Sequence, residues 1–374
     1  MKLSGIRVLD FSRFMAGPLV SSIMADHGAD VVKIEPPEGD PTRKGRRTRE
    51  HQHAGDSFCV LNRGKRSVVL DLKQPSDLAR AHALIHDADV LIESFSPGVT
   101  ARLGIDAPTA HALNPRLVYC SISAFGQSGP LRDAAGHDPA VQALAGILSR
   151  ERSGAPVVPA VSVASWGSAL AALAGVTMAL LAARSTGRGD HLDLSMHDVA
   201  LSSRPGAIFD ALESDAASLE APRGHAILEP YETADEQWLC VGAGEPRFAR
   251  ALLDALGRSD LVEMALGVPG AAQDLLRAFL SSTFRQKTLN AWLDWMSARA
   301  ISCAPVLDYA QALKHPHAAA RGMLIADTQG ALHLNTPLCF VHEPGQPSLR
   351  VPELGEHTEA VLAQYAPLID RPSR

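Results

Sequence analysis

Short apolar runs alternate with longer helix-like stretches through the first half of the chain. The runs have the length of buried strands, whereas the stretches between them carry apolar residues at the spacing of an amphipathic helix. We therefore predict strands at 6–11, 30–35, 67–72, 89–93 and 117–123, with helices at about 16–27 and 77–86. Strands separated by helices pair in parallel, so the predicted fold class is α/β, with a Rossmann-like parallel sheet covered by helices on both faces.

The pattern changes near residue 204. Residues 204–229 scatter proline, glycine, serine and acidic residues and predict a linker. A hairpin and three helices follow, at 230–233 with 237–243, and at 246–256, 271–281 and 288–300. The pattern predicts a large α/β domain over 1–203 and a small α+β domain over 230–315. Residues 316–374 contain a further linker, strand-like segments and a terminal helix.

Composition adds the expectation of a cytoplasmic enzyme. A chain of 374 residues exceeds one ordinary domain, which favours two. The net charge of -6, with 20% charged residues, gives no reason to expect nucleic acid or an anionic membrane as a partner. The five cysteines lie far apart without a Cys-x-x-Cys pair, which predicts free thiols in a reducing compartment and no zinc site. The first strand begins almost at once, leaving no room for a signal peptide.

Residues 166–183 contain no charged side chain, and their number is close to the minimum for a membrane-spanning helix. The segment is dominated by Ala, Gly, Ser and Thr, and no aromatic residues flank its end at Arg184. We therefore predict a buried helix whose small residues let other elements pack closely.

Candidate chemistry concentrates at Gly136-His137-Asp138, which follows a turn rich in glycine and proline and precedes an apolar helix-like run. One interpretation is a reactive carboxylate beside an imidazole. The other is a helix N-cap, in which Asp138 accepts a backbone N–H and Pro139 occupies the first helical position. The local sequence alone favours the cap.

Other motifs exclude several classes of site. The first turn lacks Gly-x-Gly-x-x-Gly, which argues against a dinucleotide-binding site. It contains instead a tight loop at 15–18, whose backbone is predicted to lie against a flat ligand. His82 and His86 are four residues apart but have no third ligand nearby, so we predict an exposed pair and no metal. Ser195 has no Gly-x-Ser-x-Gly around it, which argues against a serine hydrolase.

Taken together, the motifs resemble those of the family III CoA-transferases, which include the α-methylacyl-CoA racemases. The matching runs occur in the family's order, among them Gly-Ala-Asp-Val-Val-Lys-Ile-Glu at 28–35, Gly-Gln-Ser-Gly-Pro at 126–130, Gly-His-Asp at 136–138 and Leu-Gly-Glu-His-Thr at 354–358. The resemblance covers nearly the whole chain. It implies an interlocked homodimer in which the C-terminal part returns to the large domain.

The resemblance also implies coenzyme A as a substrate, with no tightly bound cofactor and no metal. Since CoA is a polyanion with a flat base and a thin arm, its site needs cations and an apolar slot. Two cationic clusters, at 43–49 and 63–66, are available, although the first is also typical of a solvated loop. Proline occupies position 36, where some members have an arginine. The residues implied to contact CoA are Met15, Ala16, Leu70, Lys73, Phe95 and Arg102.

Two reactions are compatible with the family. In the transferases the aspartate matching Asp138 is a nucleophile that forms an aspartyl-CoA thioester, so that CoA passes from an acyl-CoA to a carboxylic acid. In the racemases a histidine matching His137, supported by a glutamate matching Glu245, is one of two bases. The second base aligns with Ser165, whose hydroxyl is too weak to deprotonate an α-carbon. We therefore rank the transferase above the racemase or another enolate-forming enzyme, and a non-catalytic acyl-CoA-binding protein third.

Overall fold

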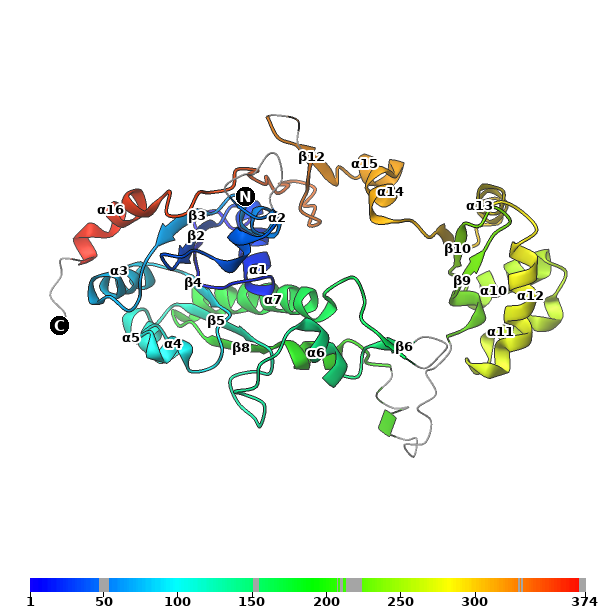
Figure 1. Ribbon diagram of the computed structural model, residues 1–374, viewed down its shortest axis with the longest axis horizontal. Coiled ribbons are helices and arrows are strands. Elements are labelled where there is room, and N and C mark those ends of the chain that lie inside the picture. Colours follow the sequence, from blue (N-terminus) through cyan, green and yellow to red (C-terminus); the bar gives the residue numbers. More distant parts are fainter. Residues whose placement is uncertain are drawn as a thin grey trace. The chain divides into compact units, whose positions relative to one another are not determined.

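The computed structural model describes residues 1–46, 54–150, 155–206, 208, 211–212, 224–328, 330 and 332–369. The chain divides into two compact units. The large unit contains Met1–Ser214 and Gly322–Arg374, and the small unit contains Asp215–Arg321. Figure 1 labels the elements of both units.

A six-stranded, wholly parallel sheet forms the centre of the large unit, in the order β3-β2-β1-β4-β5-β8. Its strands are β1 (Arg7–Asp10), β2 (Asp30–Glu35), β3 (Arg66–Val69), β4 (Val90–Glu93), β5 (Val118–Ser123) and β8 (His191–Ser195). The α/β fold class predicted from the sequence is confirmed.

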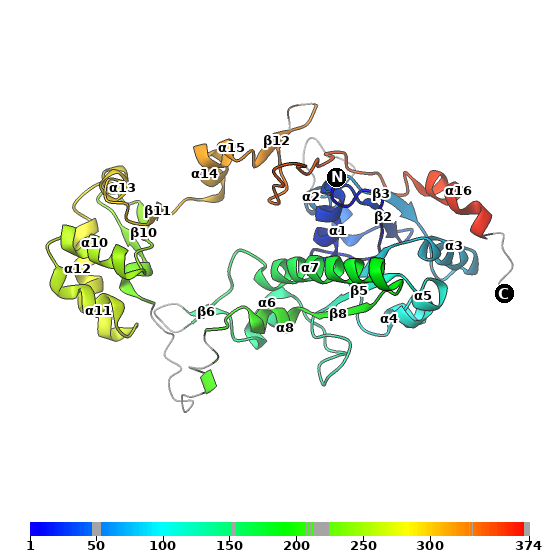
Figure 2. The same ribbon diagram turned by 180° about the vertical axis from the view of Figure 1, so that it is seen from behind.

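Consecutive strand residues face two separate cores. Val8 and Val90 pack into a core with α1 (Ala16–Asp26) and α7 (Val163–Thr186), whereas Leu9 and Leu91 pack into a core with α3 (Pro75–His86) and α5 (Ala107–Leu113). Side chains alternate between the faces of a strand, so a sheet covered on both faces needs uninterrupted apolar runs. Figure 2 shows α1 beside α7, and α3 beside α5.

The C-terminal segment belongs to the large unit. Its last helix, α16 (Thr358–Ile369), contacts α3 and β3. The Val69 amide donates a hydrogen bond to Thr358 Oγ1 at 3.0 Å, and the His357 amide donates to the Ser67 carbonyl at 2.9 Å. These contacts lie on the edge strand of the sheet, so they cover backbone groups of β3 that no further strand pairs with.

Helix α7 is buried on one face only. Ala169, Ala172 and Val176 are buried against the sheet and α1. On the other side Met178 is 66% exposed and Leu181 is 73% exposed. The prediction of a buried helix is therefore right for one face and wrong for the other. The helix is long and apolar enough to cross a membrane, a criterion that the core helix of a soluble protein also meets.

Buried ion pairs fix the loops at the start of the large unit. Lys65 Nζ lies 2.9 Å from Asp10 Oδ2, and Lys33 Nζ lies 2.9 Å from Asp40 Oδ2, with all four side chains almost fully buried. Arg43 donates to both oxygens of Glu35, and Arg63 pairs with Asp26, again in buried positions. Arg43, Arg63 and Lys65 are therefore unavailable to CoA, because each is buried against an internal carboxylate. Lys44 and Arg46 of the first cluster are exposed, as a solvated loop predicts. Residues 47 and 49 of the first cluster lie outside the described residues.

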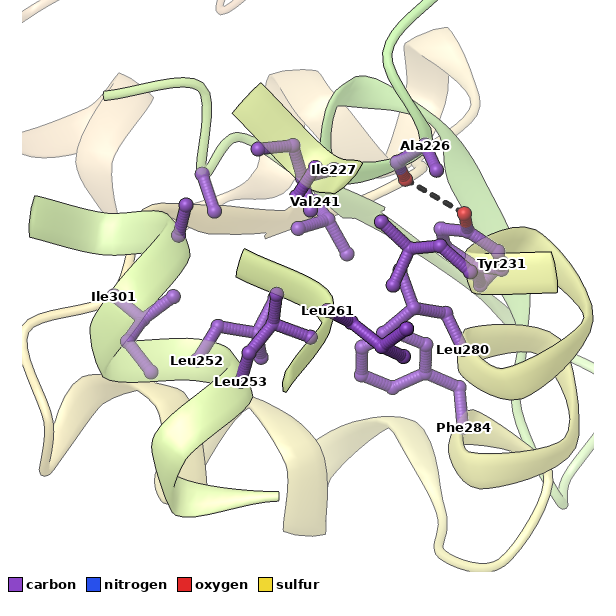
Figure 3. Packing of buried hydrophobic residues seen from close by; sticks show 14 of the residues in the cluster. Ala226, Ile227, Tyr231, Val241, Leu252, Leu253, Leu261, Leu280, Phe284 and Ile301 are labelled. Atoms are coloured by element: carbon purple, nitrogen blue, oxygen red, sulfur yellow. Dashed lines mark hydrogen bonds between the residues drawn. The ribbon is translucent and has the colours of Figure 1, made fainter. Parts of the chain in front are cut away.

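The small unit contains an antiparallel sheet of β9 (Pro230–Glu232), β10 (Trp238–Val241) and β11 (Cys303–Pro305), in the order β11-β10-β9. Figure 3 shows its core, where Tyr231 donates a hydrogen bond to the Ala226 carbonyl at 2.6 Å. Ala226 and Ile227 are buried in this core, so the predicted linker at 204–229 is wrong at its end. The helices of this unit are α10 (Pro246–Ala255), α11 (Val262–Leu266), α12 (Asp274–Phe284), α13 (Leu289–Ser297), α14 (Tyr309–Lys314) and α15 (Pro316–Ala320).

Shorter elements complete the large unit. The helices are α2 (Asp56–Asn62), α4 (Val99–Arg102), α6 (Asp138–Leu144) and α8 (Met196–Ser202). The strand pairs are β6 (Ser149–Arg150) with β7 (Pro156–Val157), and β12 (Leu324–Ala326) with β13 (Leu332–Leu334), both antiparallel. Of these, α4 and α6 follow the ends of β4 and β5 and bring side chains to the carboxyl edge of the sheet.

Candidate active site

The loops that follow β1, β4 and β5 enclose a cavity of about 300 Å³ at the carboxyl edge of the sheet, the usual ligand site of an open α/β fold. We call it the Asp138 cavity. Five of the residues predicted from the sequence line it, namely Met15, Ala16, Phe95, His137 and Asp138. Ser165, at the start of α7, lines it as well.

A second cavity, of about 570 Å³, shares Phe95 and Arg13 with the first. We call it the Lys73 cavity, because Lys73 and Leu70 line it from the loop after β3. Pro36 also lines it, so a proline ring faces the space where some members have an arginine. The Arg13 guanidinium lies 5.3 Å from the centre of the Phe95 ring.

Arg102 lines neither cavity and occupies the last turn of α4, next to the lining residue Leu103. A Cβ atom on Gly98 would lie 3.6 Å from the guanidinium of Arg102 and equally far from that of Arg132. Gly98 has a φ of 81°, a conformation that favours glycine. The turn after β4 and the loop after β5 therefore bring two cations together near the edge of the cavities.

Both oxygens of Asp138 are hydrogen-bonded. Oδ2 accepts the backbone N–H of Ser165 at 2.6 Å, and Oδ1 accepts the side-chain amide of Gln142. His137 is the N-cap of α6 and makes no capping bond with its side chain, while Asp138 is the first residue within the helix. The N-cap interpretation is therefore wrong for α6, because the N–H that Asp138 accepts belongs to the first turn of α7.

The turn before Asp138 requires glycine. A Cβ atom on Gly136 would lie 2.5 Å from Ala124 Cβ and 2.9 Å from the Phe125 ring. The next residue, His137, is exposed and meets Phe14 edge-to-face, with ring centres 6.1 Å apart. Phe14 adopts a φ of 65°, which costs about 1–3 kcal/mol for a non-glycine residue. The strained loop after β1 thus presents an aromatic ring to the histidine.

Glu245 belongs to the other compact unit. It lies in the small unit, as the N-cap of α10, and its carboxylate lies 2.9 Å from the guanidinium of Arg247, with both side chains exposed. The prediction of an exposed histidine pair on α3 is right for His86 and wrong for His82. His86 is exposed, whereas His82 is partly buried and forms a hydrogen bond with the Gly104 carbonyl at 2.7 Å.

Gln142, Arg13 and Arg132 are site residues that the sequence reasoning missed. For Gln142 a signal existed, since residues four apart on a helix lie on the same face and Gln142 is four residues after Asp138. For metals, no group of three or more His, Cys, Asp or Glu side chains within the described ranges is placed to hold an ion.

Glu93 is a buried carboxyl at the end of β4, and its Oε2 accepts the Phe95 amide at 2.8 Å. Burial raises the pKa of Glu93 to about 7, and the nearby Asp193 carboxylate also raises it, while hydrogen bonds from Ser121 and Phe95 lower it. A carboxyl that changes charge near neutral pH therefore holds the backbone of a residue shared by both cavities.

We expect stability to depend on the titration of Glu93. The folded protein retains a proton that the unfolded chain releases at about pH 4.3, so stability should fall by up to about 3 kcal/mol as the pH rises from about 4.5 to 7. The Glu93→Gln variant cannot titrate at this position, so its stability should depend less on pH than that of the wild type. Burial also raises the pKa of Asp26 to about 6, and Asp26 contributes equally to the pH dependence of both proteins. Urea unfolding across this pH range measures the difference, and equal pH slopes would contradict the assignment.

A parallel α/β unit with a hydrogen-bonded carboxylate at the sheet edge defines an enzyme-like site, and comparison with known proteins identifies its class. The model of CoA-transferase family III matches residues 3–358. The chain therefore belongs to CoA-transferase family III, which confirms the resemblance seen in the motifs.

Relatives in the family differ in activity. The chain is 32% identical to succinate–glutarate CoA-transferase of Agrobacterium fabrum, over 97% of this chain and 95% of that protein. It is 33% identical to human α-methylacyl-CoA racemase, over 98% and 94% of the two chains. A crystal structure of a CAIB/BAIF family protein from Brucella suis has a TM-score of 0.83 at 29% identity, covering 97% of this chain and 99% of that one. These relatives support CoA transfer or another acyl-CoA enzyme activity.

Proposed function

We propose that this protein transfers CoA from an acyl-CoA thioester to a carboxylic acid, with Asp138 as the covalent nucleophile. The observation that carries the proposal is the Asp138 carboxylate itself, which lines a cavity and has both oxygens oriented by hydrogen bonds. A nucleophile that is already held in its reactive orientation lowers the activation free energy, because no entropy is lost in orienting it during the reaction. The succinate–glutarate and oxalate CoA-transferases among the relatives support the same reaction class.

The proposed reaction has two covalent stages. The carboxylate of Asp138 attacks the thioester carbonyl and releases CoA thiolate, giving a mixed anhydride. The thiolate then attacks the aspartyl carbonyl, releases the donor acid and leaves an aspartyl-CoA thioester. An acceptor carboxylate reverses both stages, so the energy of the thioester is conserved throughout. Water must stay out, because it would hydrolyse either intermediate.

Coenzyme A fits the two adjoining cavities. We propose that its nucleotide occupies the Lys73 cavity, against Leu70 and Lys73, and that its arm passes Phe95 and the loop at Met15 and Ala16 to reach Asp138. Phe95 lines both cavities, which supports a continuous path between them. The nearby Arg102 supplies a further cation at the turn after β4.

A racemase is the second candidate, because a human relative has that activity and His137 lines the same cavity as Asp138. Two bases are needed on opposite faces of the substrate. The Ser165 side chain cannot serve as one of them, and its backbone N–H is already bound to Asp138. These observations favour the transferase.

The deciding experiment incubates the purified protein with a panel of acyl-CoAs and carboxylic acids in D₂O and follows products by mass spectrometry. We expect exchange of CoA between acids, without epimerisation of 2-methylacyl-CoA. Rapid epimerisation with deuterium at the α-carbon would establish the racemase. Tight acyl-CoA binding with neither reaction would favour the third alternative, a binding protein.

Removal of a cation should weaken CoA binding. We expect Lys73→Ala and Arg102→Ala each to cost about 1–3 kcal/mol of CoA affinity, the range for a lost charge-assisted hydrogen bond, with a smaller effect on the chemical step. Arg80→Ala is the control, since Arg80 is an exposed cation of α3 that lines neither cavity. Isothermal titration with CoA measures the change. Unchanged CoA affinity in both variants would contradict the proposed position of the nucleotide in the Lys73 cavity.

We also propose a cytoplasmic homodimer, as the resemblance implies. The exposed apolar side chains of α7, including Met178 and Leu181, supply a surface that a second protein chain could cover. The five cysteines are all free, which fits a reducing compartment.

A further inference from the structure

We propose that the side-chain amide of Gln142 and the backbone N–H of Ser165 give the two oxygens of Asp138 different and fixed roles. Oδ1, bound to Gln142, is the oxygen that attacks. Oδ2, bound to Ser165, stays on the aspartyl carbon as its carbonyl oxygen and carries the negative charge when that carbon is attacked. The inference rests on the proposed function, since it assigns roles within the same covalent route.

The two donors differ in rigidity. Ser165 lies in the first turn of α7, where backbone N–H groups have no partner within the helix, so its N–H is free to bind Asp138. The helix has 24 residues, and its aligned peptide dipoles favour negative charge at this end. Gln142 donates instead from a side chain on α6, 1% exposed, whose rotatable bonds leave its amide less rigidly fixed than a main-chain N–H. The fixed donor therefore suits the oxygen that stays in place.

The bonds made and broken distinguish the oxygens. When Oδ1 attacks the thioester carbonyl, the C–S bond breaks and the sulfur leaves with its electron pair as CoA thiolate. When the thiolate attacks the aspartyl carbon, an electron pair moves onto Oδ2, which becomes an oxyanion facing the Ser165 N–H. Collapse of this intermediate breaks the bond to Oδ1, so Oδ1 departs with the donor acid. The acceptor acid then brings a replacement oxygen to that position.

This balance predicts a labelling pattern. Each complete turnover replaces Oδ1 with an oxygen from the acceptor acid and leaves Oδ2 untouched. With an acceptor carrying ¹⁸O in its carboxylate, the peptide that contains Asp138 should therefore gain one heavy oxygen and never a second. If the Asp138 carboxylate rotated by half a turn between catalytic cycles, its two oxygens would exchange places and both would become labelled.

The experiment runs many turnovers with an ¹⁸O-labelled carboxylic acid, then digests the protein and weighs the Asp138 peptide. One heavy oxygen supports the inference. Two heavy oxygens in the unmodified protein would overturn it and leave the covalent route intact. Active CoA transfer without any label in Asp138 would overturn the covalent route, and the inference with it.

Gln142→Met tests the donor directly, because methionine preserves the shape of the side chain and cannot donate. We expect kcat to fall by roughly 10²–10³-fold with unchanged CoA affinity, because Gln142 stabilises the negative charge that returns to Oδ1 when the bond between Oδ1 and the aspartyl carbon breaks. A carboxylate released from Gln142 should also rotate, so the variant should acquire a second heavy oxygen, a result that a merely structural role would not give. Gln346→Met, an exposed glutamine of the same unit, is the control. Wild-type rate and single labelling in Gln142→Met would exclude the role of Gln142.

Discussion

Asp138→Ala should reduce CoA transfer by roughly 10⁴-fold or more, the scale at which enzymes lose activity with their nucleophile. No acyl group can then attach to the protein, and the donor and acceptor acids cannot exchange CoA through it. Folding and CoA binding should stay close to wild type, because Asp138 is only partly buried and Lys73 and Leu70 line the neighbouring cavity. Exchange between labelled acyl-CoA and an acceptor acid measures the loss.

Two further measurements make this test specific. Hydroxylamine added during turnover should convert Asp138, and no other carboxyl, to a hydroxamate, because it attacks activated aspartyl groups. Asp198→Ala is the control, since that aspartate is 77% exposed at the start of α8 and does not line the cavity. An Asp138→Ala protein that keeps a tenth of the activity would rule out the covalent mechanism.

Lys65→Met should destabilise the large unit by about 3–5 kcal/mol, the usual result when one partner of a buried ion pair is removed. Lys65 Nζ donates to Asp10 at 2.9 Å, to the Pro18 carbonyl at 2.9 Å and to Asn62 at 2.8 Å. Without the lysine, the Asp10 carboxylate keeps its hydrogen bonds from Ser12 and Ser21 but loses its ion pair with Lys65, and the oxygens of Pro18 and Asn62 lose a buried donor. Hydrogen–deuterium exchange of peptides from β1 and α2 reports the local loss of stability.

An exposed ion pair provides the matched control. Arg80 pairs with Asp77 at 2.8 Å on the surface of α3, and Arg80→Met should cost less than about 1 kcal/mol. The double variant Lys65→Met with Asp10→Asn should recover part of the stability, because it removes the charge left behind. A Lys65→Met effect no larger than that of Arg80→Met would contradict the role assigned to the pair.

The sequence predicted the sheet because its signal is local. Pairs such as Val8 with Leu9 form unbroken apolar runs, and such runs are what a strand buried on both faces requires. The sequence could not predict that Lys65 is buried in an ion pair with Asp10. Lys65 and Asp10 are 55 residues apart, and only the register of the folded strands brings them together. Nor could composition show that one face of α7 is exposed in the single chain.

The site was predictable in part for the same reason. The residues of Gly136-His137-Asp138 are adjacent in the chain, so a motif could point to them. The partner of Asp138 on α7 is 27 residues away and donates from its backbone, which no pattern of side chains reports. The sequence instead drew attention to the Ser165 side chain as a missing base.

The contact between Asp138 and the main chain at position 165 also has an evolutionary consequence. Every amino acid except proline carries the same N–H, so substitution at this position can change the side chain that faces the cavity without removing the bond to the carboxylate. An acidic or a neutral side chain can therefore occupy position 165 during evolution, while Asp138 still accepts the hydrogen bond from the main-chain N–H at that position. In such a site the main chain conserves one function as the side chain diverges toward another.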